Sequence, residues 1–219
     1  MLPTEEVGSE KRSMADSQVP AVAPNLDCGI LRRIDTVVPG QIGVAVVIGW
    51  MLHVLDQHTV CYTKAPLRVK IFIWLAWRKR LWTGDRRQRH GLVARESCFL
   101  CDAAVETCNH ILFECSFALQ VWNRVFTPLG LSRPSADGCV SVLEWWQRAR
   151  SAWPSSVRKG GNSLLLLVMW MLWKERNARC FRGDFATADA VVSRVVSAAS
   201  EWVSAGASAL GALGCTIRE

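Results

Sequence analysis

The chain has 219 residues, half of them hydrophobic, and a formal net charge of +7 at neutral pH. This length and composition suffice for one medium-sized domain with a packed core, with or without appended segments. The nine cysteines are an odd number, and residues 1–6 are polar and acidic, unlike a secretory leader. We therefore exclude a disulfide scaffold and expect an intracellular protein, nuclear or cytoplasmic, whose cysteines are metal ligands or free thiols.

The N-terminal residues show no hydrophobic period. Residues 1–27 mix serine, proline, alanine and charged residues, and we predict a disordered tail over residues 1–40. Residues 42–55 are apolar almost throughout, but this run is shorter than the ~20 residues that a membrane helix needs. We interpret residues 41–59 as an apolar segment of unclear role, either part of the core or an orphaned fragment.

Two helices are predicted next. Pro66 suits the first turn of a helix that we expect to run to about Arg80. Four apolar residues recur on it at helical spacing and predict its buried stripe: Leu67, Ile71, Trp74 and Leu75. A shorter helix is expected from Thr83 as its cap to Gly91 as its stop.

Residues 64–95, which we call the basic arm, hold the positive charge of the chain. Between Lys64 and Glu96 ten cations face two acidic residues, a net of +8, so the rest of the chain nets −1. The ten are Lys64, Arg68, Lys70, Arg78, Lys79, Arg80, Arg86, Arg87, Arg89 and Arg95. Such clustering predicts a nucleic-acid contact, in which the interleaved Trp77 and Trp82 could stack on unpaired bases. The alternative is a solvated helix face with both tryptophans in the core.

Four residues with the spacing of a metal site follow: Cys98, Cys101, His110 and Cys115. The Cys98/Cys101 pair can fold back as a knuckle that offers two thiolates, and the other two residues can complete a tetrahedron from a helical turn and its exit. Zinc suits this set best because it accepts sulfur and nitrogen and imposes no d-electron geometry. The protein fills all four positions, which favours one structural Zn²⁺ over a catalytic one. Arg95 could offset the net negative charge of such a site.

Two alternatives to this ligand set stay open. Cysteines are commonly buried as small apolar residues, so the spacing could arise by chance in a cysteine-rich chain. Cys108 is also a rival fourth ligand, because positions 108 and 110 point to different faces of a helix. We favour His110, whose second ring nitrogen stays available for a further hydrogen bond.

Residues 60–126 resemble the reverse-transcriptase zinc-binding domain of plant non-LTR retrotransposons in order, spacing and residue type. The similar segments are residues 63–76, 80–83, 89–92, 98–101, 106–113, 115–118 and 121–122, with a weaker similarity at 170–177 that extends to about 181. The resemblance implies a bound zinc. In full-length relatives the domain lies downstream of the polymerase, often before a ribonuclease H domain. The spacing is longer than the Cys-x2-Cys-x4-His-x4-Cys of retroviral nucleocapsids, so direct base recognition does not carry over.

The remaining chain is predicted to be helical. Ser116 can cap a helix through Phe126, and a linker is expected at residues 127–140. A helical extension then covers residues 141–205: a capping box, Ser141 with Glu144, opens a helix to about residue 152, a long apolar helix covers residues 163–181, and an amphipathic one covers 187–205. Residues 206–219 read as a flexible C-terminus. The predicted fold is mainly α, a small zinc-stapled helical domain with a helical C-terminal extension and a disordered N-terminal tail.

Catalytic function is not expected. Polymerases and ribonucleases H need clustered carboxylates that hold two metals, and the chain has no Asp-Asp pair. We predict a non-catalytic zinc-binding module, derived from a retrotransposon reverse transcriptase, that contacts RNA or DNA through the basic arm. One alternative is a zinc-stapled protein-interaction module whose partner meets the tryptophan-rich residues 141–181, and another is a retroelement relic with no selected function. No membrane and no small-molecule substrate are expected.

Overall fold

The computed structural model describes residues 63–92, 95–133 and 135–214, which all lie in the compact unit Val47–Glu219. The predicted tail and the apolar segment at 41–59 fall outside the described residues. Within the described part the chain is helical, and its one ladder contact is an isolated antiparallel bridge between Ser97 and Val105. The prediction of a mainly α fold is confirmed.

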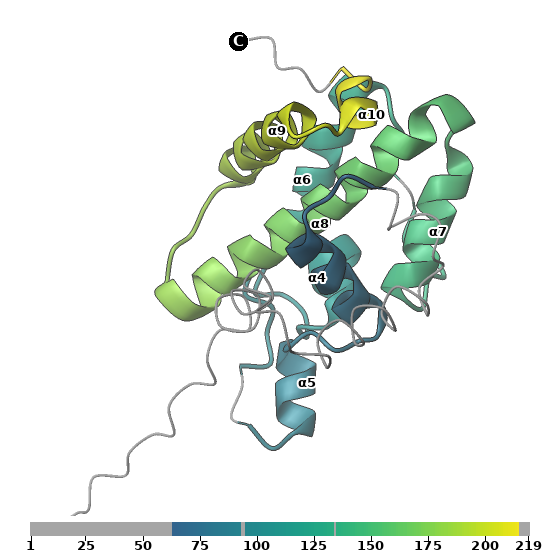
Figure 1. Cartoon of the computed structure of the whole chain (residues 1–219). Coiled ribbons are helices and arrows are strands. Elements are labelled where there is room, and N and C mark those ends of the chain that lie inside the picture. Colours follow the sequence, from purple (N-terminus) through teal and green to yellow (C-terminus); the bar gives the residue numbers. More distant parts are fainter. Residues whose placement is uncertain (1–62, 93–94, 134, 215–219) are drawn as a thin grey trace, which may run out of the picture. The chain divides into compact units, whose positions relative to one another are not determined.

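The helical elements follow one another with mostly short connections, except for the longer ones between α5 and η1 and between η2 and α7 (Figure 1). They are α4 (Leu67–Trp77), α5 (Gly84–Arg89), the π-helical turn η1 (His110–Glu114), α6 (Ser116–Phe126), the 3-10 turn η2 (Thr127–Leu129), α7 (Val142–Ala152), α8 (Ser155–Arg182), α9 (Ala188–Ser204) and α10 (Ser208–Gly211).

Helix α8 is the centre of this unit, because α4, α6, α7, α9, α10 and η1 all pack against it (Figure 1). Its residues 160–173 are buried without a break, so the helix is covered on every face over this stretch, which is apolar from Leu164 to Trp173. No described helix combines the length and the apolar content that crossing a bilayer would require. The apolar run of α8 is therefore explained by six surrounding elements of the same chain.

Helix α8 begins eight residues before the predicted start, at Ser155 rather than at residue 163. Glycines at 160 and 161 are poor helix formers, but here they allow close contacts. A Cβ on Gly160 would lie 2.1 Å from the carbonyl oxygen of Ala209, and one on Gly161 would lie 2.4 Å from the ring of Trp153. Two neighbours thus approach the helix at positions that only glycine can occupy.

The buried face of α4 agrees with the predicted stripe only at Ile71, which is buried. Leu67 is 37% exposed, Trp74 and Leu75 are intermediate, and the other buried residues of the helix are Val69, Phe72, Ile73 and Ala76. Phe72 packs edge-on against Trp170 of α8, with ring centroids 5.3 Å apart. The face is set by the position of α8, a partner about a hundred residues away in sequence. The helix also ends at Trp77, before the predicted Arg80, and Lys79 just beyond it takes a positive φ of 52°.

The N-cap half of the predicted capping box before α7 is present, and the Glu144 side chain reaches back one residue further than predicted, to Val140. Ser141 accepts a hydrogen bond from the backbone N–H of Glu144, at 3.2 Å, and Glu144 accepts one from the N–H of Val140, at 3.0 Å. The helix that follows buries Trp145 and Trp146 completely. The tryptophans of residues 141–181 therefore belong to the core. They do not form the exposed apolar surface that a protein partner would need under the alternative function.

The C-terminal part differs from the prediction of a loose end. Helix α9 begins as expected after Thr187, whose side chain accepts from the N–H of Ala190. Residues 208–211 then form α10, which buries Leu210 completely and packs on α8 and α9. The sequence of this stretch is poor in large side chains, so its packing depends on one leucine and on the glycine contacts of α8.

Gly160→Ala should lower the free energy of unfolding by about 1–3 kcal/mol, because the new methyl group collides with the backbone at Ala209. The expected readout is a lower midpoint in urea or heat. Gly211→Ala is the matched control, since its Cβ would meet a side chain, that of Val203 at 3.2 Å, and not a backbone atom at 2.1 Å. Equal stability of the two variants would contradict the close packing of α8 and α10.

Candidate metal centre

The Cys98–Cys101 pair sits on a knuckle, a tight turn closed by backbone hydrogen bonds. The N–H of Cys98 donates to the oxygen of Ala104 at 2.8 Å, and the N–H of Asp102 donates to the oxygen of Cys98 at 2.8 Å. Asp102 has a positive φ of 59°, which reverses the chain. The N–H of Leu100 points at the sulfur of Cys98, at 3.3 Å, so backbone dipoles already favour a thiolate there.

His110 and Cys115 are brought to the knuckle by η1. Thr107 starts this turn: its hydroxyl accepts from the N–H of His110 at 3.0 Å, and its carbonyl accepts from Ile111. The N–H of Cys115 donates to the oxygen of His110 at 2.7 Å, which closes the wide turn and places both side chains on the same side. Three fully buried apolar residues, Ile111, Leu112 and Phe113, hold η1 in the core.

The four predicted ligands converge. The sulfurs of Cys98, Cys101 and Cys115 and a ring nitrogen of His110 all lie within 4.8 Å of one another. The Cys98 and Cys115 sulfurs are 4.0 Å apart, and Cys101 Sγ is 3.2 Å from His110 Nε2. In a tetrahedral site with Zn–S near 2.3 Å and Zn–N near 2.0 Å, ligand atoms are separated by about 3.5–3.8 Å. The cluster fits a zinc ion with no open position for a substrate.

The electrostatics of the cluster favour a cation. The hydrogen bond with Cys115, supported by His110, lowers the pKa of Cys98 to about 4, while the same bond raises the pKa of Cys115. The neighbouring Cys98 sulfur raises the pKa of His110 to about 9. Thiolates this close repel one another, so protons or a cation must hold the four groups together. A divalent ion replaces those protons when it binds.

Cys108 is not part of the cluster. Its side chain is buried against α4, with the sulfur 3.7 Å from the oxygen of Ala76. Burial raises the pKa of this thiol to about 12, so it is a neutral packing group at physiological pH. Of the two candidates for a fourth ligand, the structure brings His110 to the other three residues and directs Cys108 away from them.

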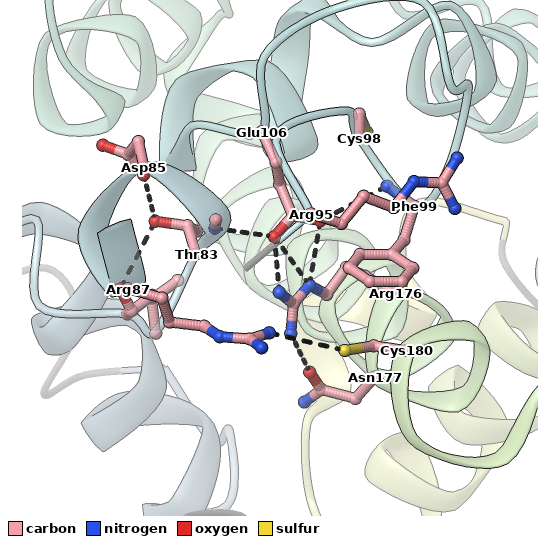
Figure 2. Close-up of polar contacts among 12 residues, drawn as sticks. Thr83, Asp85, Arg87, Arg95, Cys98, Phe99, Glu106, Arg176, Asn177 and Cys180 are labelled. Atoms are coloured by element: carbon pink, nitrogen blue, oxygen red, sulfur yellow. Dashed lines mark hydrogen bonds and ion pairs between the residues drawn. The ribbon is translucent and has the colours of Figure 1, made fainter. Parts of the chain in front are cut away.

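A buried ion pair behind the knuckle was not anticipated from the sequence. Glu106 and Arg176 of α8 are 0% and 1% exposed at their side chains, and Nε of Arg176 lies 3.1 Å from each carboxylate oxygen of Glu106 (Figure 2). The same carboxylate accepts from the backbone N–H of Gly84, at 2.8 Å, and of Phe99, at 3.3 Å. One side chain therefore joins α5, the knuckle and α8.

Arg179, one turn after Arg176, also holds the knuckle. It donates to the carbonyl oxygen of Leu100 at 2.8 Å and to Glu175 at 2.8 Å. The signal in the sequence is the segment 174–177, Lys-Glu-Arg-Asn, which places charged residues directly after an apolar run. This segment resembles the family, but the pairing of Arg176 with Glu106, seventy residues earlier, is visible only in the fold.

The structure divides the cations of the basic arm into two groups. Four arginines make contacts within the chain: Arg86 with the oxygen of Lys79 and the ring of Trp82, Arg87 with the sulfur of Cys180, Arg89 with Asp85, and Arg95 with Asp102 and the ring of Phe99. Of these four, Arg89 and Arg95 are still exposed, with 65% and 42% of their side chains accessible. Five other cations are exposed as well: Lys64, Arg68, Arg78, Lys79 and Arg80, and Lys70 is intermediate. The accessible charge of the arm therefore comprises these five cations together with Arg89 and Arg95.

The two tryptophans of the basic arm differ in their surroundings. Trp77 packs against the fully buried Trp146, with ring centroids 5.0 Å apart, and so belongs to the contact between α4 and α7. Trp82 is half-buried, between His90 at 5.3 Å and the guanidinium of Arg86 at 5.1 Å. Of the two, Trp82 is the better placed to meet a base.

Residues 52–122 match the family model for zinc-binding in reverse transcriptase, and all four converging ligands lie within that match. This segment is thus similar to the zinc-binding domain of reverse transcriptases. The resemblance to retrotransposon sequences is thereby confirmed, and zinc is the metal that the cluster is suited to hold.

A plant relative supports the same origin. Over 118 residues, 54% of this chain, the sequence is 27% identical to a protein of Arabidopsis thaliana named "Putative ribonuclease H protein". The match covers 18% of that relative, so the chain spans less than a fifth of its length. No solved structure matches the chain significantly.

Arg176→Met should lower the free energy of unfolding by about 3–5 kcal/mol, because it leaves the Glu106 carboxylate buried without its counter-ion. Urea unfolding of the zinc-saturated protein measures this. The double variant Glu106→Gln/Arg176→Met should recover part of the loss. Arg182→Met is the control: its pair with Asp184 is exposed, so the cost should stay below about 1 kcal/mol. Equal costs for Arg176→Met and Arg182→Met would contradict the role of the buried pair.

Proposed function

We propose that Cys98, Cys101, His110 and Cys115 bind one structural Zn²⁺, and that the zinc-binding domain presents a basic surface to nucleic acid. The convergence of the four donor atoms, all within 4.8 Å, is the observation that supports this proposal most directly. The ion closes the knuckle onto η1 and leaves no coordination site for a reacting group. Its contribution is to the fold and to the position of the arm.

The exposed cations support the nucleic-acid part of the proposal. Arg78, Lys79 and Arg80 follow directly after α4, on a turn whose positive φ at Lys79 sets the side chains around a sharp bend. Arg86 donates to the carbonyl oxygen of Lys79, at 2.9 Å, which steadies this turn. Exposed cations on an ordered turn are suited to phosphate contacts, because the backbone that carries them is already fixed and only side-chain entropy is lost when they bind.

The module acts by binding rather than by catalysis. The ribonuclease H activity implied by the name of the plant relative belongs to a protein more than five times as long as the matched segment. The four zinc ligands are all supplied by the protein, whereas hydrolysis of nucleic acid uses carboxylates that hold metal ions beside the substrate. A protein-interaction role for residues 141–181 is less favoured, since Trp145 and Trp146 are fully buried in the core and are not accessible to a partner.

The ligand set predicts a clear mutational pattern. Metal analysis should find one zinc per wild-type chain, and Cys98→Ser and His110→Ala should lose it, because three ligands cannot close the site. Cys108→Ser is the matched control and should keep the metal, since its sulfur contacts Ala76 instead. The charge-transfer absorption of the Co²⁺-substituted protein reports the number of thiolates independently. Loss of metal in Cys108→Ser with retention in His110→Ala would reverse the assignment of the fourth ligand.

The exposed cations predict a salt-dependent affinity. Replacing Arg78 and Arg80 with alanine should weaken binding to single-stranded RNA or DNA and flatten the plot of log affinity against log salt by about 0.7 for each lost phosphate contact. Fluorescence anisotropy at several salt concentrations measures both effects. The control removes the same charge elsewhere, with Arg148→Ala and Arg182→Ala on α7 and α8. Equal slopes for the two double variants would show that the turn after α4 is only a solvated face.

A further inference from the structure

A groove of about 230 Å³ lies between α4, α8 and α9. Its lining residues include none of the four metal ligands. Of the residues predicted to contact nucleic acid, they include Arg68 alone. The apolar lining of the groove includes two core residues, Trp170 of α8 and Trp202 of α9, each 7% exposed. Both helices pack on one another, and α4 packs on α8, so the walls belong to one ordered body (Figure 1).

The rim of the groove is positive. Arg68 of α4, Lys174 of α8 and Arg194 of α9 line it from three different helices, against Glu201 as the one acid among its lining residues. Arg68 and Lys174 are exposed, and the side chain of Arg194 is 58% exposed. Lys174 is the one exposed residue within the stretch 160–178 of α8, and the residues on either side of it along the helix are buried.

Arg194 is held in place by the same network that holds the knuckle. Glu175, 1% exposed, accepts from Nη1 of Arg194 at 3.1 Å and from Nε of Arg179 at 2.8 Å. Arg179 in turn donates to the carbonyl oxygen of Leu100 in the knuckle. A cation of the groove is therefore connected to the metal centre by two hydrogen-bonded side chains, without touching the ligands.

We infer that this groove binds the sugar–phosphate backbone of a single-stranded nucleic acid and extends the surface of the basic arm across α8 to α9. The inference rests on the proposed function, and it adds a second contact site with its own residues. Cations from three helices surround an apolar floor, which suits alternating phosphates and sugars. A single strand can lay its backbone along a groove of this size, whereas a duplex would contact only the cations of the rim.

Lys174→Ala and Glu201→Gln test the groove with opposite signs. The probe is a fluorescein-labelled oligothymidylate of about 20 nucleotides, titrated with the full zinc-loaded chain at several salt concentrations. Lys174→Ala should weaken binding and lower the salt slope by about 0.7, whereas Glu201→Gln should tighten binding because it removes the one negative charge of the lining. Arg182→Ala, on the same helix but outside the groove, should behave as wild type. Neither tested side chain makes a contact that the fold needs among the described residues, so the variants should keep the unfolding midpoint of the wild type.

The outcomes separate the two proposals. If the wild type binds without any salt dependence, both the nucleic-acid function and the groove are overturned. If Arg78→Ala/Arg80→Ala weakens binding while Lys174→Ala and Glu201→Gln match the wild type, the function stands and the groove is excluded. If a duplex of the same length binds as tightly and depends equally on Lys174, the assignment of a single strand is wrong.

Discussion

The buried pair of Glu106 and Arg176 is the interaction on which the rest of the described structure depends. Removing two charges from water costs several kcal/mol for each ion, and their attraction offsets this only when the remaining hydrogen-bonding capacity is satisfied. Here Glu106 also accepts from the N–H groups of Gly84 and Phe99, and Arg176 donates to Asn177 at 3.1 Å and lies over the rings of Phe99 and Trp173. The pair is therefore compensated at both ends, and it orients three segments at once.

The zinc-binding segment is completed by residues that lie outside it in the sequence. Its ligands lie within residues 98–115, yet the groups that complete the back of the knuckle, Arg176 and Arg179, come from α8. Helix α8 also covers α4, α6 and η1. A small zinc-stapled domain followed by an independent extension, as the sequence suggested, would have left the Glu106 carboxylate without its counter-ion and the Leu100 carbonyl without the Arg179 guanidinium. The zinc cluster and α8 instead share one core, so metal binding and the packing of α8 should stabilise each other.

The fold also determines which cations of the basic arm have contacts within the chain. The sequence presented ten cations in the basic arm as one group, but Arg86, Arg87, Arg89 and Arg95 are engaged within the chain. A guanidinium that contacts a carbonyl, a carboxylate or an aromatic face contributes to local structure before it can contribute to binding. The exposed cations lie at the two ends of α4, with Arg68 at the groove and Arg78, Lys79 and Arg80 on the turn after the helix, so the two proposed contact sites use different residues.

The sequence by itself determined the features that depend on neighbours along the chain. The spacing of Cys98, Cys101, His110 and Cys115 defined the metal cluster, and local signals at Thr83, Ser141 and Thr187 located the starts of α5, α7 and α9. Only the tertiary structure decided the buried face of α4, the direction of Cys108, the ordered residues 208–211 and the pairing of Glu106 with Arg176. Periodicity shows that a helix has an apolar face but not which partner covers it. The buried charges are paired across seventy residues, and such a pair leaves no local pattern.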